Sequence, residues 1–286
     1  MLGIGSYGFI TSNQLWVLQQ CSDSDVQRLK AINLLDVASN LGLSVSGIII
    51  SFILLENFKF LFATISMVLI ATSLFLLFVN KKLIDEREAI KFSRSTDFTG
   101  SNNKNSKIII YILFSVFLVG LIISQINSNY PLFLQKKFIN LDTRSFSILF
   151  ILNSMLVVLF QSPLVNAISK YNRIFIVGLG AFLLGFGMLF LNFAIYFYLA
   201  VISCIIYTLG EMLFFSVAQL ICYEMALPNK KGSSIGIYRT VYAFSRVIGP
   251  TFGGIIFSTS PAMLWYVCGL FGLMSLLPAF YFRQLN

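Results

Sequence analysis

The sequence predicts an all-α protein whose helices cross a lipid bilayer several times. Of its 286 residues, 57% are hydrophobic and 11% are charged, whereas soluble domains carry about 25% charged residues. The mean hydropathy is +0.85. The apolar residues fall into about nine runs, each long enough, or nearly so, for the roughly 20 residues with which a helix crosses a bilayer. Two parts of the chain also resemble each other, which indicates a repeated set of helices.

The predicted spans follow one another with a single long interruption. They lie near residues 2–20, 31–54, 57–80, 107–128, 145–167, 174–193, 196–222, 234–257 and 262–282. The first is the least apolar, because Ser, Thr, Asn and Gln side chains fall between positions 6 and 14. Residues 81–106 are rich in Lys, Ser, Asn and Asp, which predicts a solvated linker, with a short amphipathic helix over residues 83–92. We therefore expect one helix bundle in residues 1–80 and a six-helix bundle in residues 107–286.

The repeat relates the second predicted span to the eighth. Residues 42–49 (GLSVSGII) resemble residues 249–256 (GPTFGGII), about 207 positions later. Repetition of helix sets is typical of secondary transporters, in which the substrate site lies between the repeats. If the second unit begins near residue 107, its partner would begin about 100 residues before Met1, so we expect the first bundle to lack three helices. The spans before these two segments match at four positions, at a shift of about 205: Gly5 with Gly210, Phe9 with Phe214, Gln14 with Gln219, and Leu15 with Leu220.

The distribution of basic residues predicts an orientation. The net charge of +9 could indicate nucleic-acid binding, but the basic residues lie in loops between apolar spans, as the positive-inside rule describes. With the linker in the cytoplasm, 15 basic residues fall on the cytoplasmic side and four outside. We therefore expect a cell-membrane protein with a cytoplasmic linker and C-terminus, lipid as its surroundings and no nucleic-acid partner. Outside the linker, the cytoplasmic residues are Arg28, Lys30, Lys107, Lys170, Arg173, Lys230, Lys231, Arg239 and Arg283, and the outer ones are Lys59, Lys136, Lys137 and Arg144.

The residue types argue against several functional classes. The chain has no histidine, and its four cysteines have no paired spacing, so we expect no metal, no cofactor and no disulfide framework. A membrane-embedded enzyme would need clustered His, Asp or Glu, and the acids here are scattered. No stretch matches G-x-x-x-x-G-K-S/T, so an ion gradient rather than a nucleotide would supply energy. The cysteines are Cys21, Cys204, Cys222 and Cys268.

Short motifs in the second half of the chain carry a more specific signal. They are residues 124–125 (SQ) with 129–132 (NYPL), 161–163 (QSP), 170–173 (KYNR), 208–215 (TLGEMLFF), and 231–232 (KG) with 249–254 (GPTFGG). In order and spacing they resemble helices seven to eleven of the major facilitator superfamily, and more narrowly of its drug-efflux-like branch. The resemblance implies a two-bundle fold in which this chain supplies helices four to twelve, lacks the first three, and has an incomplete N-terminal bundle.

The resemblance also implies a function. A protein of this branch would be a secondary active transporter of small organic molecules, and a proton-coupled antiporter that exports its substrate by alternating access. Two alternatives remain open. The chain could be a truncated, non-transporting remnant or interaction protein of the same superfamily, or an uptake transporter of a related branch.

Three ionisable residues within predicted spans are the candidates for proton coupling or an ion pair, because charge in the bilayer core costs about 2.5–3.5 kcal/mol even on lenient scales. Glu211 and Arg246 lie at matching depth on antiparallel neighbours, so we hypothesise that they face each other. Glu211 would be a proton-coupling carboxylate, one half of a static ion pair, or without contact to Arg246. Asp36 shares a helix face with Asn33 and Asn40, which favours either a substrate or proton path or a polar contact between helices.

Two further sets of residues are candidates for binding and packing. Uncharged polar side chains would line a substrate cavity suited to an amphipathic or cationic organic molecule; they are Gln125, Asn129, Asn153 and Gln161. Small residues at four-residue spacing let helices approach closely, either as ordinary packing or where the two halves move against each other; they are Gly42, Ser46, Gly47, Gly249, Gly253 and Gly254, with a kink expected at Pro250.

Overall fold

In the computed structural model, helices account for almost all of the described chain, as the sequence predicts. The described residues are 10, 12–18, 25–53, 63, 66–68, 70–75, 103–138, 143–168, 170–227 and 230–283. None of them forms a strand. The chain divides into two compact units, one of residues 1–42 with 101–286 and one of residues 43–100. Most of the expected linker, including its amphipathic helix, lies outside the described residues, so the bundle boundary at residue 80 stays a prediction.

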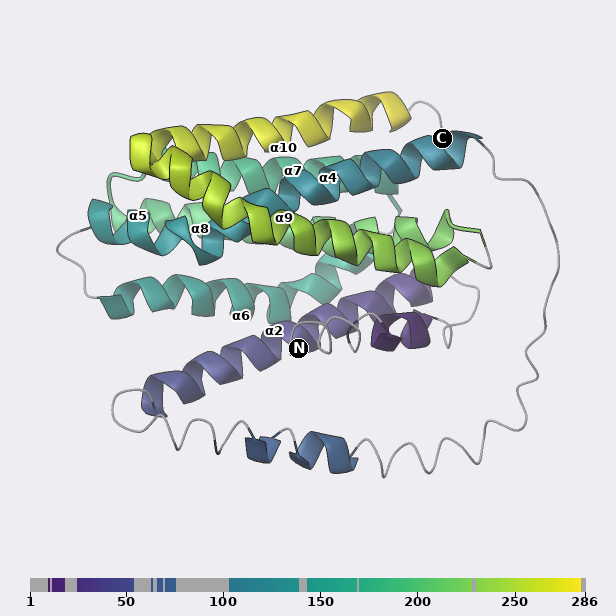
Figure 1. Ribbon diagram of the computed structural model, residues 1–286, viewed down its shortest axis with the longest axis horizontal. Coiled ribbons are helices and arrows are strands. Elements are labelled where there is room, and N and C mark those ends of the chain that lie inside the picture. The colour runs from purple at the N-terminus through teal and green to yellow at the C-terminus, as the bar shows by residue number, and fades with distance from the viewer. Residues whose placement is uncertain are drawn as a thin grey trace. The chain divides into compact units, whose positions relative to one another are not determined.

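The helices of the described part are labelled in Figure 1. They are α2 (Asp25–Ile53), α4 (Asn103–Asn127), α5 (Asn129–Lys137), α6 (Thr143–Ile168), α7 (Arg173–Phe190), α8 (Phe197–Glu224), α9 (Lys231–Thr259) and α10 (Pro261–Arg283), with a 3-10 turn η2 (Leu191–Phe193) after α7. Residues 12–18 add a helical segment before α2, and α2 belongs to the first unit as far as Gly42.

Within the described residues, five helices are long and apolar enough to cross a membrane. They are Ser106–Asn127, Ile148–Ile168, Arg173–Phe193, Phe197–Glu224 and Pro261–Phe282, which correspond to the fourth to seventh and the ninth predicted spans. The eighth predicted span is α9, a 29-residue helix that falls outside this group because it carries several basic and polar side chains. The first and third predicted spans lie mostly outside the described residues.

Glycines set the packing around α7. This helix lies between α8 and α10, which Figure 1 shows in its upper half. A Cβ at Gly180 would lie 2.8 Å from the Phe214 backbone nitrogen of α8, and one at Gly185 would lie 2.9 Å from the Gly272 Cα of α10. The helix backbones can therefore approach closely, which replaces the hydrophobic driving force that lipid does not supply. Sequence reasoning did not single these glycines out, although four of them occur within α7.

A second close contact joins α9 to α4. A Cβ at Gly249 would collide with the Ser124 side chain, and one at Gly253 would collide with the side-chain amide of Gln125. Both glycines are buried. Their lack of a side chain is thus required by the α4 side chains that occupy the space.

The other small residues of the predicted set are placed differently. A Cβ at Gly254 or at Gly42 would meet nothing within 4 Å, because these positions face away from the neighbouring helices. Pro250 lies inside α9 and is exposed. The surroundings of Ser46 and Gly47 are outside the described part of the structure.

A proline explains why α4 and α5 are separate helices. Pro131 has no N–H to donate to the Asn127 carbonyl, and its ring crowds that carbonyl. The helix is interrupted at Ser128, directly after Asn127. The short α5 then places Tyr130 against the rings of Tyr207 and Trp265, in edge-to-face contacts with centroids 6.1 and 6.4 Å apart.

Basic side chains at the two ends of the first unit follow the predicted alternation of helices. Near the end of α5, Lys136 lies over the Phe257 ring of α9, and Lys137 donates to the Leu191 and Asn192 carbonyls of η2, directly after α7. At the opposite ends of α7 and α8, Arg173 pairs with Glu224. Consecutive spans therefore run up and down, which is the premise of the predicted orientation.

Candidate functional site

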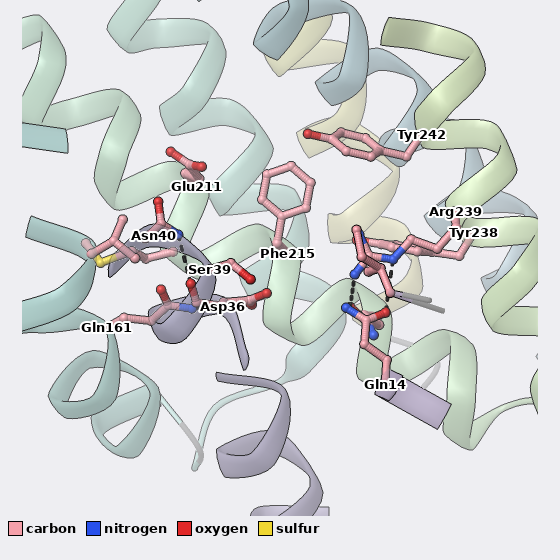
Figure 2. Close-up of a pocket in the computed structure, with 14 residues that line it drawn as sticks. Gln14, Asp36, Ser39, Asn40, Gln161, Glu211, Phe215, Tyr238, Arg239 and Tyr242 are labelled. Atoms are coloured by element: carbon pink, nitrogen blue, oxygen red, sulfur yellow. Dashed lines mark hydrogen bonds between the residues drawn. The ribbon is translucent and has the colours of Figure 1, made fainter. Parts of the chain in front are cut away.

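A cavity of about 210 Å³ lies in the first unit, between helices from both ends of the sequence. Figure 2 shows its lining. Its polar side chains come from five helical segments: Gln14 from residues 12–18, Asp36, Ser39 and Asn40 from α2, Gln161 from α6, Glu211 and Gln219 from α8, and Arg239 from α9. The aromatic rings of Phe215, Tyr238 and Tyr242 also line the cavity.

Asp36 connects three helices through its carboxylate. Ser216 of α8 donates its hydroxyl to Oδ2 over 2.9 Å, and the Gln161 amide of α6 donates to the same oxygen over 3.4 Å. One turn earlier, Asn33 donates to the Ser162 hydroxyl over 3.0 Å. Asn33 and Asp36 therefore make polar contacts between helices, and Asp36 and Asn40 line the cavity. A substrate or proton path along this face stays a prediction.

Glu211 is held by uncharged partners. Asn153 of α6 donates to the Glu211 Oε2 atom over 3.0 Å and to the Thr208 hydroxyl over 2.9 Å. Asp36 lies near enough to Glu211 for the two carboxylates to influence each other electrostatically. One cavity therefore contains two carboxylates that come from distant parts of the sequence.

The expected ion pair between Glu211 and Arg246 is not formed. An ion pair is formed elsewhere, between Arg173 and Glu224. The Arg246 guanidinium is exposed and lies over the ring of Tyr242, 5.7 Å from its centroid. The pair is absent because the two side chains point to different partners. Glu211 points from α8 towards Asn153 of α6, whereas Arg246 lies one turn after Tyr242 on the same face of α9.

Arg239 is the cavity's basic residue, and sequence reasoning assigned it only to the cytoplasmic charges. Its Nε donates to the Gln14 side-chain oxygen over 3.0 Å, and its Nη2 to the Gln219 side-chain oxygen over 3.4 Å. Gln14 and Gln219 are one of the pairs related by the internal repeat. The repeat could have predicted a polar site near Arg239, because glutamines at equivalent positions of two repeats can converge on one group between them.

The four polar residues expected to line a cavity are divided between two places. Gln161 belongs to the lining, and Asn153 contacts Glu211. Gln125 and Asn129 instead lie in the contact between α4 and α9, where Gln125 donates to the Gly249 carbonyl over 2.8 Å and accepts from Asn129 over 2.7 Å. The glycines of α9 expose its backbone to α4, so these amides bond within the protein.

No group of His, Cys, Asp and Glu side chains in the described part of the chain could hold a metal ion. Cys204, Cys222 and Cys268 are buried thiols, in keeping with small apolar fillers, and Cys21 lies outside the described residues. The chemistry of the cavity is therefore that of carboxylates, amides, hydroxyls and one guanidinium.

Comparison with known proteins identifies the family. The sequence pattern described as "Major Facilitator Superfamily" matches residues 1–250. The chain belongs to the major facilitator superfamily. It is accordingly a multi-pass membrane protein of a family of transporters, as the apolar helices also indicate.

Two relatives from Bacillus subtilis (strain 168) belong to the same superfamily by name. The "Uncharacterized MFS-type transporter YttB" is 28% identical over 237 residues, which are 79% of this chain and 57% of YttB. The "Uncharacterized MFS-type transporter YqjV" is 29% identical over 152 residues, which are 50% of this chain and 36% of YqjV. The matched part of this chain thus spans less than two thirds of the length of either relative.

Proposed function

We propose that the protein is a secondary active transporter that exports small organic molecules in exchange for protons by alternating access. The observation that carries the proposal is the presence of two carboxylates, Asp36 and Glu211, in the lining of one cavity. Membership of a transporter family supports the general activity, and the charge pattern supports a location in the cell membrane with the linker and C-terminus in the cytoplasm.

The contacts of Asp36 suggest how proton binding would change the protein's conformation. An ionised carboxylate accepts a stronger hydrogen bond than a neutral carboxyl group. Protonation of Asp36 would therefore weaken the bond donated by Ser216, which joins α2 to α8. Arg239 is the basic residue whose charge acts on Asp36. Since α2 precedes the linker and α8 follows it, a looser contact would favour movement of one half against the other.

Glu211 would supply the second proton site. Its described partner Asn153 is neutral, and the charges that act on it are those of Asp36 and Arg246. A positively charged substrate group near Glu211 would displace the proton of this carboxyl group, and a proton would displace the substrate. Such competition is how an antiporter couples two flows through one cavity.

The test uses the full chain in proteoliposomes with an imposed proton gradient. Uptake of a panel of labelled small cations, anions and zwitterions would be measured with the gradient present and absent. We expect gradient-driven accumulation of at least one compound, and we expect Glu211→Gln to abolish accumulation while equilibration down the compound's own gradient persists.

Leu209→Ala is the matched control, because Leu209 lies on α8 like Glu211 but has 37% of its surface exposed and does not line the cavity. It should accumulate the same compound at the rate of the unaltered chain. Full proton dependence in Glu211→Gln would remove this residue from the coupling mechanism. Failure of the unaltered chain to move any compound would contradict transport by this chain.

A further inference from the structure

The cavity has two chemically different sides, which Figure 2 shows plainly. Asp36 and Glu211 lie on one side, and Arg239 lies with Tyr242 on the other. The Phe215 ring stands between them. The cavity therefore has two carboxylates on one side of an aromatic ring and a guanidinium on the other. This arrangement matches a ligand that carries a positive and a negative charge at its two ends.

The Arg239 side has more donors than acceptors. The two groups to which Arg239 donates are neutral amide oxygens, and no carboxylate of the described residues pairs with it. Two lining residues add buried polar atoms without a hydrogen-bond partner, the Gln219 Nε2 and the Tyr238 Oη. Gln219 and Tyr238 are 2% and 1% exposed. Both residues lie beside Arg239. Buried donors without partners are costly, so an anionic ligand group bound at the guanidinium would favour rotation of these side chains towards it.

The opposite side retains acceptor capacity. In the described hydrogen bonds, Asp36 uses Oδ2 and Glu211 uses Oε2. A carboxylate can accept at both oxygens, so the second oxygen of each residue is available to a ligand's ammonium group. The same two carboxylates would then respond to the substrate and to protons.

We propose that the substrate is a small zwitterion. Its ammonium group would lie at Asp36 and Glu211, its carboxylate at Arg239, Gln219 and Tyr238, and its apolar body against Phe215. The cavity volume of about 210 Å³ is below the roughly 300–1,000 Å³ of sites for drug-sized ligands, which favours a molecule about the size of one substituted ring. This assignment rests on the proposed function, because it takes the cavity as the transport site.

The test compares three probes of one shape: 4-(aminomethyl)benzoate, which carries both charges at opposite ends of a ring, benzylamine, which carries the positive charge, and benzoate, which carries the negative one. Binding to the purified full chain would be measured by calorimetry at neutral pH. We expect 4-(aminomethyl)benzoate to bind about tenfold or more tightly than either single-charge probe. Arg239→Gln should remove the preference for 4-(aminomethyl)benzoate over benzylamine, and it should not weaken benzylamine, because it takes a positive charge out of the lining.

Tyr238→Phe provides a second variant that keeps the fold, because the hydroxyl it removes makes no hydrogen bond within the protein. It should weaken the zwitterion several-fold and leave benzylamine unaffected, and Arg239→Lys should restore part of what Arg239→Gln loses. Equal binding of 4-(aminomethyl)benzoate and benzylamine, unchanged in both variants, would overturn the zwitterion while leaving a transporter of cations. Absence of binding by all three probes would also overturn it, and gradient-driven accumulation of another compound would then show that the proposed function survives.

Discussion

At the scale of single residues, the acids that line the cavity are held by neutral donors. Asn153 donates to Glu211, and Ser216 and Gln161 donate to Asp36. A permanent ion pair would lock a carboxylate in its charged form, because the opposite charge stabilises that form strongly in a medium of low dielectric constant. Amide and hydroxyl partners stabilise the charge less, so the group can exchange a proton as its surroundings change.

The partnership of Asn153 with Glu211 can be measured directly. Asn153→Ala leaves the carboxylate without its described donor and should lower the free energy of unfolding by about 1–3 kcal/mol, measured by thermal unfolding in detergent. In a Glu211→Ala background the same change should cost clearly less, because the group that needs the donor has gone. Equal costs in both backgrounds would show that Asn153 acts through packing alone.

At the scale of elements, α9 combines a polar face with a closely packed one. It is polar enough to present Arg239 to the cavity, and it is smooth enough at Gly249 and Gly253 to pack closely on α4. The close contact holds the helix through van der Waals packing and backbone hydrogen bonds, such as the one from Gln125 to the Gly249 carbonyl. The polar face is thus free to serve the cavity.

Two adjacent glycines of α9 provide a matched experiment on this packing. Gly253→Leu would drive a side chain into Gln125, whereas Gly254→Leu would enter open space. Overpacking of a filled contact typically costs about 1–3 kcal/mol, so Gly253→Leu should lower the unfolding temperature and Gly254→Leu should change it little. Comparable losses in both variants would mean that the α4 contact does not determine stability here.

At the scale of the whole molecule, the alternation of the helices converts charge pattern into orientation. Lys136 and Lys230 lie at opposite ends of the helices of the first unit, near the end of α5 and the start of α9. Both side chains are exposed. The excess of basic residues in the loops on the Lys230 side predicts that this side faces the cytoplasm.

Cysteine labelling in intact cells checks the orientation. We expect Lys136→Cys to react with a membrane-impermeant maleimide and Lys230→Cys to react only after the membrane is permeabilised. The unaltered chain is the background control, since its described cysteines are buried. The reverse labelling pattern would contradict the predicted orientation.

Much of the architecture follows from local sequence. A segment in lipid must satisfy its own backbone hydrogen bonds and therefore forms a helix, which can be recognised as a run of about 20 apolar residues. The five apolar spans, the repeat and the family motifs are all signals of this local kind. So is the glycine pair Gly249 and Gly253, whose spacing marks one helix face.

The partners of each polar side chain do not follow from local sequence. Glu211 was expected to pair with Arg246, but the rotation of α8 places its carboxylate next to Asn153. Gln125 was expected to line a cavity, but it donates to the backbone carbonyl of Gly249 in α9. Arg239 becomes a cavity residue only because Gln14 and Gln219 converge on it from distant positions in the chain. Helix rotation and helix contacts are set by the sum of many packing interactions, and no short stretch of residues contains that sum.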